Sequence, residues 1–255
     1  MLSIFLILNP GTASIKIKNK MNKKSFRINS KTTLHIAASN NQSDLDQPLY
    51  AINWFNTKSK RLYNLYGVLA FPHVKKVGGE VVFKGKINKT LSGDNSLIRE
   101  SLLIVKYPSA DSFLGLFSQK LFLLKSLLRV KAVKDFVFGF VKMTEGTARS
   151  TQKPEKYNGD KSYLVHILKG HFKEDLLNTD YPEGINLFFN GQKAAYIGRS
   201  SDDAEIKKGP FFIDRILIWE GEDKDELKSW FKTTEFPIKQ TNNIDQGIYL
   251  IDRLL

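Results

Sequence analysis

The stretch LLIVKYPSADSF, residues 102–113, contains a strand, a turn and the start of a helix. Its first six residues form an apolar run that predicts a buried strand. Pro108 ends that run, and Ser109 can act as an N-cap for the helix that follows, with Ser112 three residues on. The apolar residues beyond this point recur at helical spacing and predict one amphipathic helix: Phe113, Leu116, Phe117, Leu121, Leu124 and Leu128.

The segments on either side of this stretch complete a β-α-β-β-α-β order. Residues 49–55 are apolar and aromatic and predict a first strand. Residues 59–76 predict a helix that Pro72 kinks or breaks in two. Residues 81–91 predict the second strand, and residues 133–141, which contain three phenylalanines, predict the fourth. This order is the split βαβ pattern of a ferredoxin-like repeat.

A second, diverged copy of the same order is expected in the C-terminal part of the chain. Strands are predicted at residues 163–168, 193–198, 211–219 and 247–253, a helix at 224–231, and irregular structure with up to two short helices at 172–190. Equivalent strands lie roughly 110 residues apart, which indicates an internal duplication. One face of a ferredoxin-like sheet has no helices and must be covered. We therefore expect an α+β protein in which two ferredoxin-like repeats, residues 46–142 and 161–255, pack sheet to sheet as a dimeric α/β-barrel-type unit.

Two segments lie outside the predicted repeats. Residues 1–43 contain seven Lys and Arg residues and no Asp or Glu. This composition predicts a basic extension over residues 1–45 that is disordered or serves in targeting. A translation start at Met21 would remove its apolar run altogether. Residues 143–160 are polar, contain Gly and Pro, and predict a linker.

The composition of the chain restricts the classes of function. Its 255 residues include no Cys, which excludes disulfides, thiolate nucleophiles and thiolate metal sites. The net charge is +13, but much of the excess lies in the N-terminal segment, so we expect no specific nucleic-acid partner. No segment is long and apolar enough to span a bilayer. We expect a cytoplasmic protein, with organelle targeting by the basic segment as the alternative.

Several segments of the first repeat resemble motifs of the family called domain of unknown function 1330. Residues 46–55, DQPLYAINWF, are similar to its opening strand, D-G-P-V-x-x-L-N-L-L. Residues 71–85, FPHVKKVGGEVVFKG, resemble its P-x-x-x-x-x-G-G-x-x-x-x-x-G segment, and residues 103–113 resemble V-x-Y-P-S-x-x-x-F. Arg129 and Ala132 fall where R-x-x-A-L ends the second helix of the family.

This family belongs to the dimeric α/β-barrel superfamily, so the resemblance implies that fold. It implies no defined reaction, because the family is largely uncharacterised and superfamily relatives include small monooxygenases, dehalogenase-like and chlorite-handling enzymes and plain ligand binders. The second repeat departs from the pattern, because residues 218–221 read Ile-Trp-Glu-Gly where Tyr-Pro-Ser would be expected.

Polar residues at special positions are the candidates for ligand binding. Asn53 lies within an apolar strand, and its amide either bonds neighbouring backbone or faces a cavity. His73 would suit a general base at neutral pH. Arg129 near a helix end either complements the helix dipole or projects to an anion. Asp214 and Arg215 interrupt an apolar strand, where only one of two successive side chains can point inward and an inward charge must be paired. The full set is Asn53, His73, Tyr107, Ser109, Arg129, Asp214 and Arg215.

The sequence assigns no catalytic residue and no metal site, because the spacing of the four histidines matches no metal motif. We expect the chain to bind a small molecule in a barrel cavity. One alternative is a non-enzymatic interaction or structural module, and another is a cofactor-independent or haem-dependent oxidoreductase by superfamily analogy. No cofactor is predicted, although haem and flavin stay open. We expect either a monomer with an internal pseudo-dimer or a homodimer.

Overall fold

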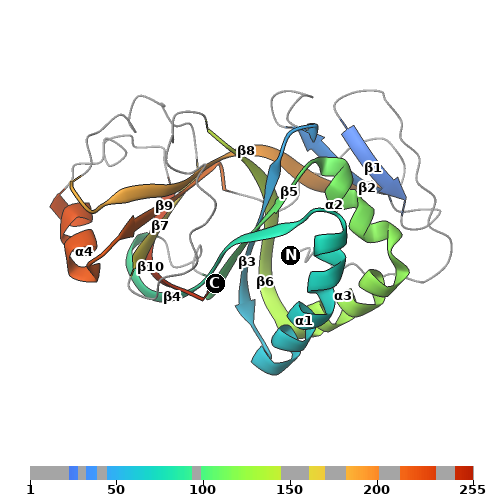
Figure 1. Ribbon diagram of the computed structural model, residues 1–255, viewed down its shortest axis with the longest axis horizontal. Helices are drawn as coiled ribbons and strands as arrows, with labels where there is room; N and C mark the ends of the chain where they lie inside the picture. Colours follow the sequence, from blue (N-terminus) through green and yellow to red (C-terminus); the bar gives the residue numbers. More distant parts are fainter. Residues whose placement is uncertain are drawn as a thin grey trace. The chain divides into compact units, whose positions relative to one another are not determined.

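The structure of the protein, a computed structural model, describes residues 23–27, 33–38, 45–93, 99–144, 161–169, 182–200, 213–233 and 245–254. Its elements are shown in Figure 1. In chain order they are β1 (Lys23–Arg27), β2 (Thr33–Ala38), β3 (Leu49–Thr57), α1 (Lys60–Lys76), β4 (Glu80–Gly93), β5 (Ser101–Tyr107), α2 (Ala110–Leu114), η3 (Gly115–Ser118), α3 (Lys120–Ala132), β6 (Val133–Met143), β7 (Ser162–Lys169), β8 (Asn186–Ser200), β9 (Arg215–Gly221), α4 (Lys224–Thr233) and β10 (Asp245–Arg253).

The strands follow one hydrogen-bonded order, β1-β2-β8-β6-β3-β5-β4-β10-β7-β9, with an additional β8–β9 pairing. Because of this additional pairing, the eight strands from β8 to β9 form a closed ring of paired strands. The central strand β3 pairs antiparallel with both β5 and β6, and β10 pairs antiparallel with both β4 and β7. This architecture confirms the predicted α+β class with a barrel-type antiparallel strand order.

The chain divides into two compact units. Unit 1 contains β1, β2, β3, α1, β5, the helices from α2 to α3, and β6; unit 2 contains β7, β9, α4 and β10. Two long strands contribute to both units. β4 belongs to unit 1 up to Val82 and to unit 2 beyond it, whereas β8 belongs to unit 2 up to Gln192 and to unit 1 beyond it.

The first helix of unit 1 begins and ends where local chemistry predicts. Ser59 has an extended backbone, and its hydroxyl accepts a hydrogen bond from the amide of Leu62 at 3.4 Å. Pro72 lies inside α1 and does not divide it into two helices. Beyond the helix, Gly78 has a positive φ of 77°, a conformation that glycine adopts without strain.

The second helical segment differs from its prediction. The single amphipathic helix expected after Ser109 is instead α2, η3 and α3. Gln119 has an extended backbone, so the helical phase changes between η3 and α3. As a result Phe122 and Ser126 are buried, whereas Leu121 and Leu124, predicted to face the core, are exposed.

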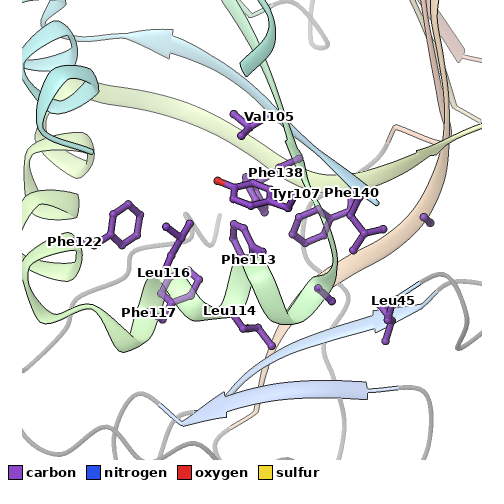
Figure 2. Packing of buried hydrophobic residues seen from close by; sticks show 14 of the residues in the cluster. Leu45, Val105, Tyr107, Phe113, Leu114, Leu116, Phe117, Phe122, Phe138 and Phe140 are labelled. Atoms are coloured by element: carbon purple, nitrogen blue, oxygen red, sulfur yellow. The ribbon is translucent and has the colours of Figure 1, made fainter. Parts of the chain in front are cut away.

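An aromatic cluster fills the core between the helices and the sheet of unit 1 (Figure 2). Phe113 lies at its centre, with ring centroids 5.2 Å from Tyr107, 5.6 Å from Phe138 and 4.9 Å from Phe140. Offset and edge-to-face pairs at such distances add to the stabilisation from burial. Phe113 is therefore a packing residue.

In unit 2, α4 packs on strands β7 and β9 through Leu227 and Phe231. Arg253 at the end of β10 is buried among rings: its guanidinium carbon lies 5.7 Å from the Phe83 centroid, 5.4 Å from Tyr163 and 5.0 Å from Phe188. Its Nη1 also donates a hydrogen bond to the hydroxyl of Tyr163 at 2.9 Å.

The strands predicted between residues 161 and 255 have other boundaries in the structure. β8 begins at Asn186 and runs to Ser200, so residues 186–190 are strand and not irregular structure. Its phenylalanines pack as strand side chains, with Phe189 buried. β9 begins at Arg215, after the start predicted for this strand. Residues 170–181, part of the segment predicted to hold short helices, lie outside the described residues, as do residues 145–160 of the predicted linker.

The N-terminal segment contains two strands. β2 pairs antiparallel with β8, from Thr33 opposite Ser200 to Ala38 opposite Ala195, and β1 pairs with β2. The prediction of an unstructured extension does not hold for these residues, because backbone pairing with a neighbouring strand needs no apolar face. The rest of residues 1–44 lies outside the described part of the chain. No helix among the described residues is long and apolar enough to cross a bilayer.

Candidate functional site

Four polar side chains of unit 1 converge between the helices and the sheet. Tyr63 and Tyr66 are three residues apart on α1, Tyr107 is the last residue of β5, and Arg129 lies in the last turn of α3. Tyr66 and Arg129 both act on the pKa of Tyr63 and on that of Tyr107. The four side chains therefore share one electrostatic environment, and we call them the tyrosine–arginine group.

The two buried phenols of this group are neutral over the physiological pH range. Burial raises the pKa of Tyr63 and of Tyr107 well above the ordinary value of 10.0, and Tyr66 raises both further. Arg129 acts in the opposite direction but does not outweigh burial. A neutral phenol keeps its proton and can donate a hydrogen bond to an oxygen of a bound molecule.

Tyr107 owes its position to the glycine pair that follows α1. A Cβ atom on Gly79 would lie 2.9 Å from Cε1 of Tyr107 and 2.5 Å from Cγ1 of Val74. A Cβ atom on Gly78 would lie 2.9 Å from Cγ of Pro108. The Gly-Gly sequence thus lets the helix end lie directly against the end of β5. This contact gives a physical reason for two successive glycines at this point of the chain.

The positive charge of Arg129 is held over a ring. Its guanidinium carbon lies 4.8 Å from the centroid of Phe136, a distance at which a cation is attracted to the aromatic face. Among the described residues, no carboxylate lies within ion-pair distance of Arg129. The side chain is only half-buried, so its charge is available to an anion.

Asn53 lies on the same face of the sheet as Tyr107. Directly opposite it on the neighbouring strands are Leu103 and Phe138, both of which pack with the helices. Its Nδ2 donates to the carbonyl oxygens of Ala51 at 3.2 Å and Leu103 at 3.3 Å. The amide is thus bonded to neighbouring backbone, the first of the two roles open to it.

The middle of this layer is not sealed from solvent. Asn53 is on the central strand β3, yet it is only partly buried, and so are Leu103 and Phe136 beside it. Solvent therefore reaches the layer between the sheet and the helices of unit 1. Asn53, Tyr107 and Arg129, three of the residues singled out in the sequence, lie in this layer together with Tyr63 and Tyr66.

His73 belongs to a separate network. Its Nδ1 lies 2.6 Å from Oε1 of Gln119, and its Nε2 lies 3.0 Å from Nζ of Lys125. Because an ammonium group only donates, we assign Nε2 as the acceptor and Nδ1–H as the donor to Gln119. Lys125 also donates to the carbonyl of Leu69 at 3.2 Å. This network ties α1 to α3 and occupies both ring nitrogens.

The remaining candidates have structural contacts. The Ser109 hydroxyl accepts a hydrogen bond from the amide of Ser112 at 3.2 Å and caps α2, as predicted. Asp214 lies in a bend before β9, where its N–H donates to the carbonyl of Leu168 at 2.9 Å. Arg215 is buried in unit 2; its Nε donates to Oδ1 of Asn190 at 2.9 Å, and its Nη2 to Oγ1 of Thr144 at 3.3 Å. Of this adjacent pair only Arg215 points fully inward.

Tyr63 and Tyr66 were missed in the sequence. Both lie at the helical spacing expected of an apolar face, so the sequence pattern did not distinguish either tyrosine from a core residue. A tyrosine pair three residues apart on α1 is informative only once Arg129 and Tyr107 are known to face it.

The described histidines have contacts within the protein. Both ring nitrogens of His73 are engaged by Gln119 and Lys125. His166 is fully buried against Phe231, with ring centroids 5.7 Å apart. The side chain of His35 and the whole of His171 lie outside the described residues. No cluster of potential metal ligands is found among the described residues.

Comparison with known proteins identifies no family for the chain. No family model matches the chain, and this includes the domain of unknown function 1330. No curated protein matches its sequence.

Among solved structures, the chain is similar to a candidate monooxygenase from Fusobacterium nucleatum, with 12% identity and a TM-score of 0.45 over 82% of this chain and 93% of that chain. It is similar to an anthrone oxidase-like protein, with 13% identity and a TM-score of 0.41 over 85% and 94%. It is also similar to a protein of unknown function from Rhodopseudomonas palustris, with 21% identity and a TM-score of 0.37 over 39% and 85%. These neighbours include proteins of the dimeric α/β-barrel type. With TM-scores this low, the similarity carries no argument about function.

Proposed function

We propose that the protein binds a small molecule in the helix-facing layer of unit 1. The observation that carries this proposal is the partial exposure of Asn53, Leu103 and Phe136 at the centre of that layer. Core residues at the middle of a sheet are normally sealed, and polar groups that converge on an accessible apolar layer are typical of ligand sites.

The chemistry of the layer favours a small aromatic molecule with one anionic oxygen. Phe136, which is partly exposed beside Asn53, provides ring surface for an aromatic body. Arg129 provides a positive charge, and the neutral hydroxyls of Tyr63 and Tyr107 provide hydrogen-bond donors. A carboxylate or phenolate would satisfy all three groups, and hydrogen bonds to a charged group are the stronger class.

Titration calorimetry with salicylate and 2-naphthoate tests the proposal. Removing the charge with Arg129→Gln should weaken binding by about ten- to a hundredfold, since a hydrogen bond to a charged group contributes about 1.5–3 kcal/mol. Tyr107→Phe, which removes only a hydroxyl, should weaken it by a smaller factor. Lys131→Gln is the matched control, because Lys131 is an exposed cation on the same helix.

Two outcomes would contradict the proposal. One is that no aromatic carboxylate in a wider thermal-shift screen raises the melting temperature. The other is that Arg129→Gln binds such a compound as tightly as the unchanged protein does.

We also infer that the chain arose by tandem duplication of a ferredoxin-like unit. In support, the first half follows the full β-α-β-β-α-β order with β3, α1, β4, β5, the helices α2 to α3, and β6. The described part of the second half follows β7, β8-β9-α4-β10. In each half the second strand is the long one, with 14 residues in β4 and 15 in β8, and each contributes to both units. Descent from the domain of unknown function 1330 family is part of this proposal.

A further inference from the structure

Two helices of unit 1 expose large apolar side chains. Figure 1 shows α1 and α3 side by side, and the hydrogen bond from Lys125 to the carbonyl of Leu69 joins them. Six large hydrophobic residues on these helices are exposed, Val68 most of all at 73%. We call them the α1–α3 apolar surface: Leu65, Val68, Phe71, Leu121, Leu124 and Leu127.

This surface results from the helical phase described above. The break at Gln119 turns Phe122 toward the sheet, which leaves Leu121 and Leu124 facing outward. Single exposed leucines are common on protein surfaces, but a set gathered on two neighbouring helices is typical of an interaction site.

The charged residues of the two helices have one sign. Neither α1 nor α3 contains an Asp or a Glu. Together the two helices carry eight basic residues: Lys60, Arg61, Lys75, Lys76, Lys120, Lys125, Arg129 and Lys131. One of them, Lys75, lies over the exposed ring of Phe71, with Nζ 5.2 Å from the centroid. Basic and apolar side chains are therefore interleaved on the same surface.

We propose that the α1–α3 apolar surface docks the protein on an anionic lipid bilayer. Apolar side chains on a basic helical face can enter the boundary between headgroups and acyl chains, while the lysines extend to the phosphate level. Each basic residue near an anionic membrane strengthens binding about fivefold. The observation that favours a membrane is this combination of leucines with a charge of one sign.

Other occupants fit less well. A second copy of the chain would bring two basic surfaces together, and like charges in an interface are unfavourable. A nucleic acid would match the charge, but it would leave the leucines without a partner, since nucleic-acid surfaces are read by basic, polar and aromatic side chains. The proposal is independent of the ligand site, because the six apolar residues are exposed and none of them belongs to that site.

Vesicle cosedimentation with the full chain tests the proposal. We expect binding to vesicles that contain phosphatidylcholine and phosphatidylserine, weaker binding to phosphatidylcholine alone, and loss of binding as salt is added. The triple variant Val68→Ser, Leu121→Ser and Leu124→Ser should reduce partitioning at least about tenfold. Leu254→Ser is the matched control, since Leu254 is 51% exposed but lies in unit 2.

Charge variants separate the two contributions. Lys75→Gln combined with Lys131→Gln should weaken partitioning to the anionic vesicles, by about fivefold for each lysine. Lys232→Gln on α4, also an exposed lysine, should not change it. All substituted side chains are exposed, so the melting temperatures should stay close to that of the unchanged protein.

Three results would overturn the proposal. The first is that the unchanged protein binds neither vesicle type, or both equally. The second is that the triple variant partitions like the unchanged protein, which would assign any membrane binding to another segment. The third is a dimer by light scattering that the triple variant converts to a monomer, because the surface would then be a contact between copies of the chain.

Discussion

Arg253 and Tyr163 of unit 2 should be energetically coupled. The guanidinium is buried among three rings, and its Nη1 donates to the Tyr163 hydroxyl at 2.9 Å. Tyr163→Phe removes that hydroxyl and keeps the ring, so the cation loses one acceptor without losing its aromatic contacts. Hydrogen bonds to charged groups contribute about 1.5–3 kcal/mol, and we expect a loss of about 2 kcal/mol in the free energy of unfolding.

Arg253→Met should have a mixed effect. It loses the hydrogen bond and the attraction to the rings, which is worth about 0.5–2 kcal/mol at such sites. It also removes the cost of burying a charge, and hydrophobic replacements of buried ions are often tolerated. Once the cation is gone, the Tyr163 hydroxyl has no hydrogen bond with it to lose. Adding Tyr163→Phe to Arg253→Met should therefore cost little further free energy of unfolding.

Urea unfolding of the two single variants and the double variant measures the coupling. We expect a coupling energy of about 1–2 kcal/mol, since residues in contact are not additive. Tyr66→Phe in unit 1 is the control and should be additive with Arg253→Met within about 0.5 kcal/mol. Additivity between Tyr163→Phe and Arg253→Met would refute the contact as described.

Four further substitutions test unit 1. Gly79→Ala should lower the free energy of unfolding by about 1–3 kcal/mol, because its Cβ would overlap Val74 and Tyr107; Gly67→Ala, where no atom lies within 4 Å, should raise it by about 0.5–1 kcal/mol in chemical denaturation. Since burial raises the pKa of Tyr63 and Tyr107 above 10.0, the contribution of these neutral phenols to the free energy of unfolding should be complete below pH 10 and decline above it. A Tyr107→Phe variant whose free energy of unfolding falls above pH 10 as steeply as that of the unchanged protein would contradict this. Ser109→Ala should lower the melting temperature through the loss of about 1 kcal/mol of capping.

Periodicity predicted most elements of the first half, because its segments carry one dominant signal each. The apolar run before Pro108 is β5, and Ser109 caps the helix after it. Gln119 has no comparable signal: a polar residue within an apolar pattern fits a continuous helix. The change of phase there depends on the packing of Phe117 and Phe122, whose centroids are 6.2 Å apart, and no local pattern records such contacts.

The candidate site was only partly predictable for a similar reason. Asn53 was identifiable as a polar residue in an apolar strand, and Arg129 as a cation at a helix end. Their presence in one layer depends on the register that sets Asn53 opposite Leu103 and Phe138. Arg215 was singled out by the same logic, but its hydrogen bonds to Asn190 and Thr144 in unit 2 are long-range contacts.

The pairing of β4 has a consequence for synthesis on the ribosome. Gly85 pairs with Arg253 and Gly93 with Gly247, so this part of β4 is translated long before its partner β10. Until β10 has been translated, the strand presents an open edge to other nascent chains, a known route to aggregation. Lysines on such an edge disfavour pairing with another copy, and Lys86 and Lys89 are exposed on β4. We infer that they protect the nascent chain during this interval.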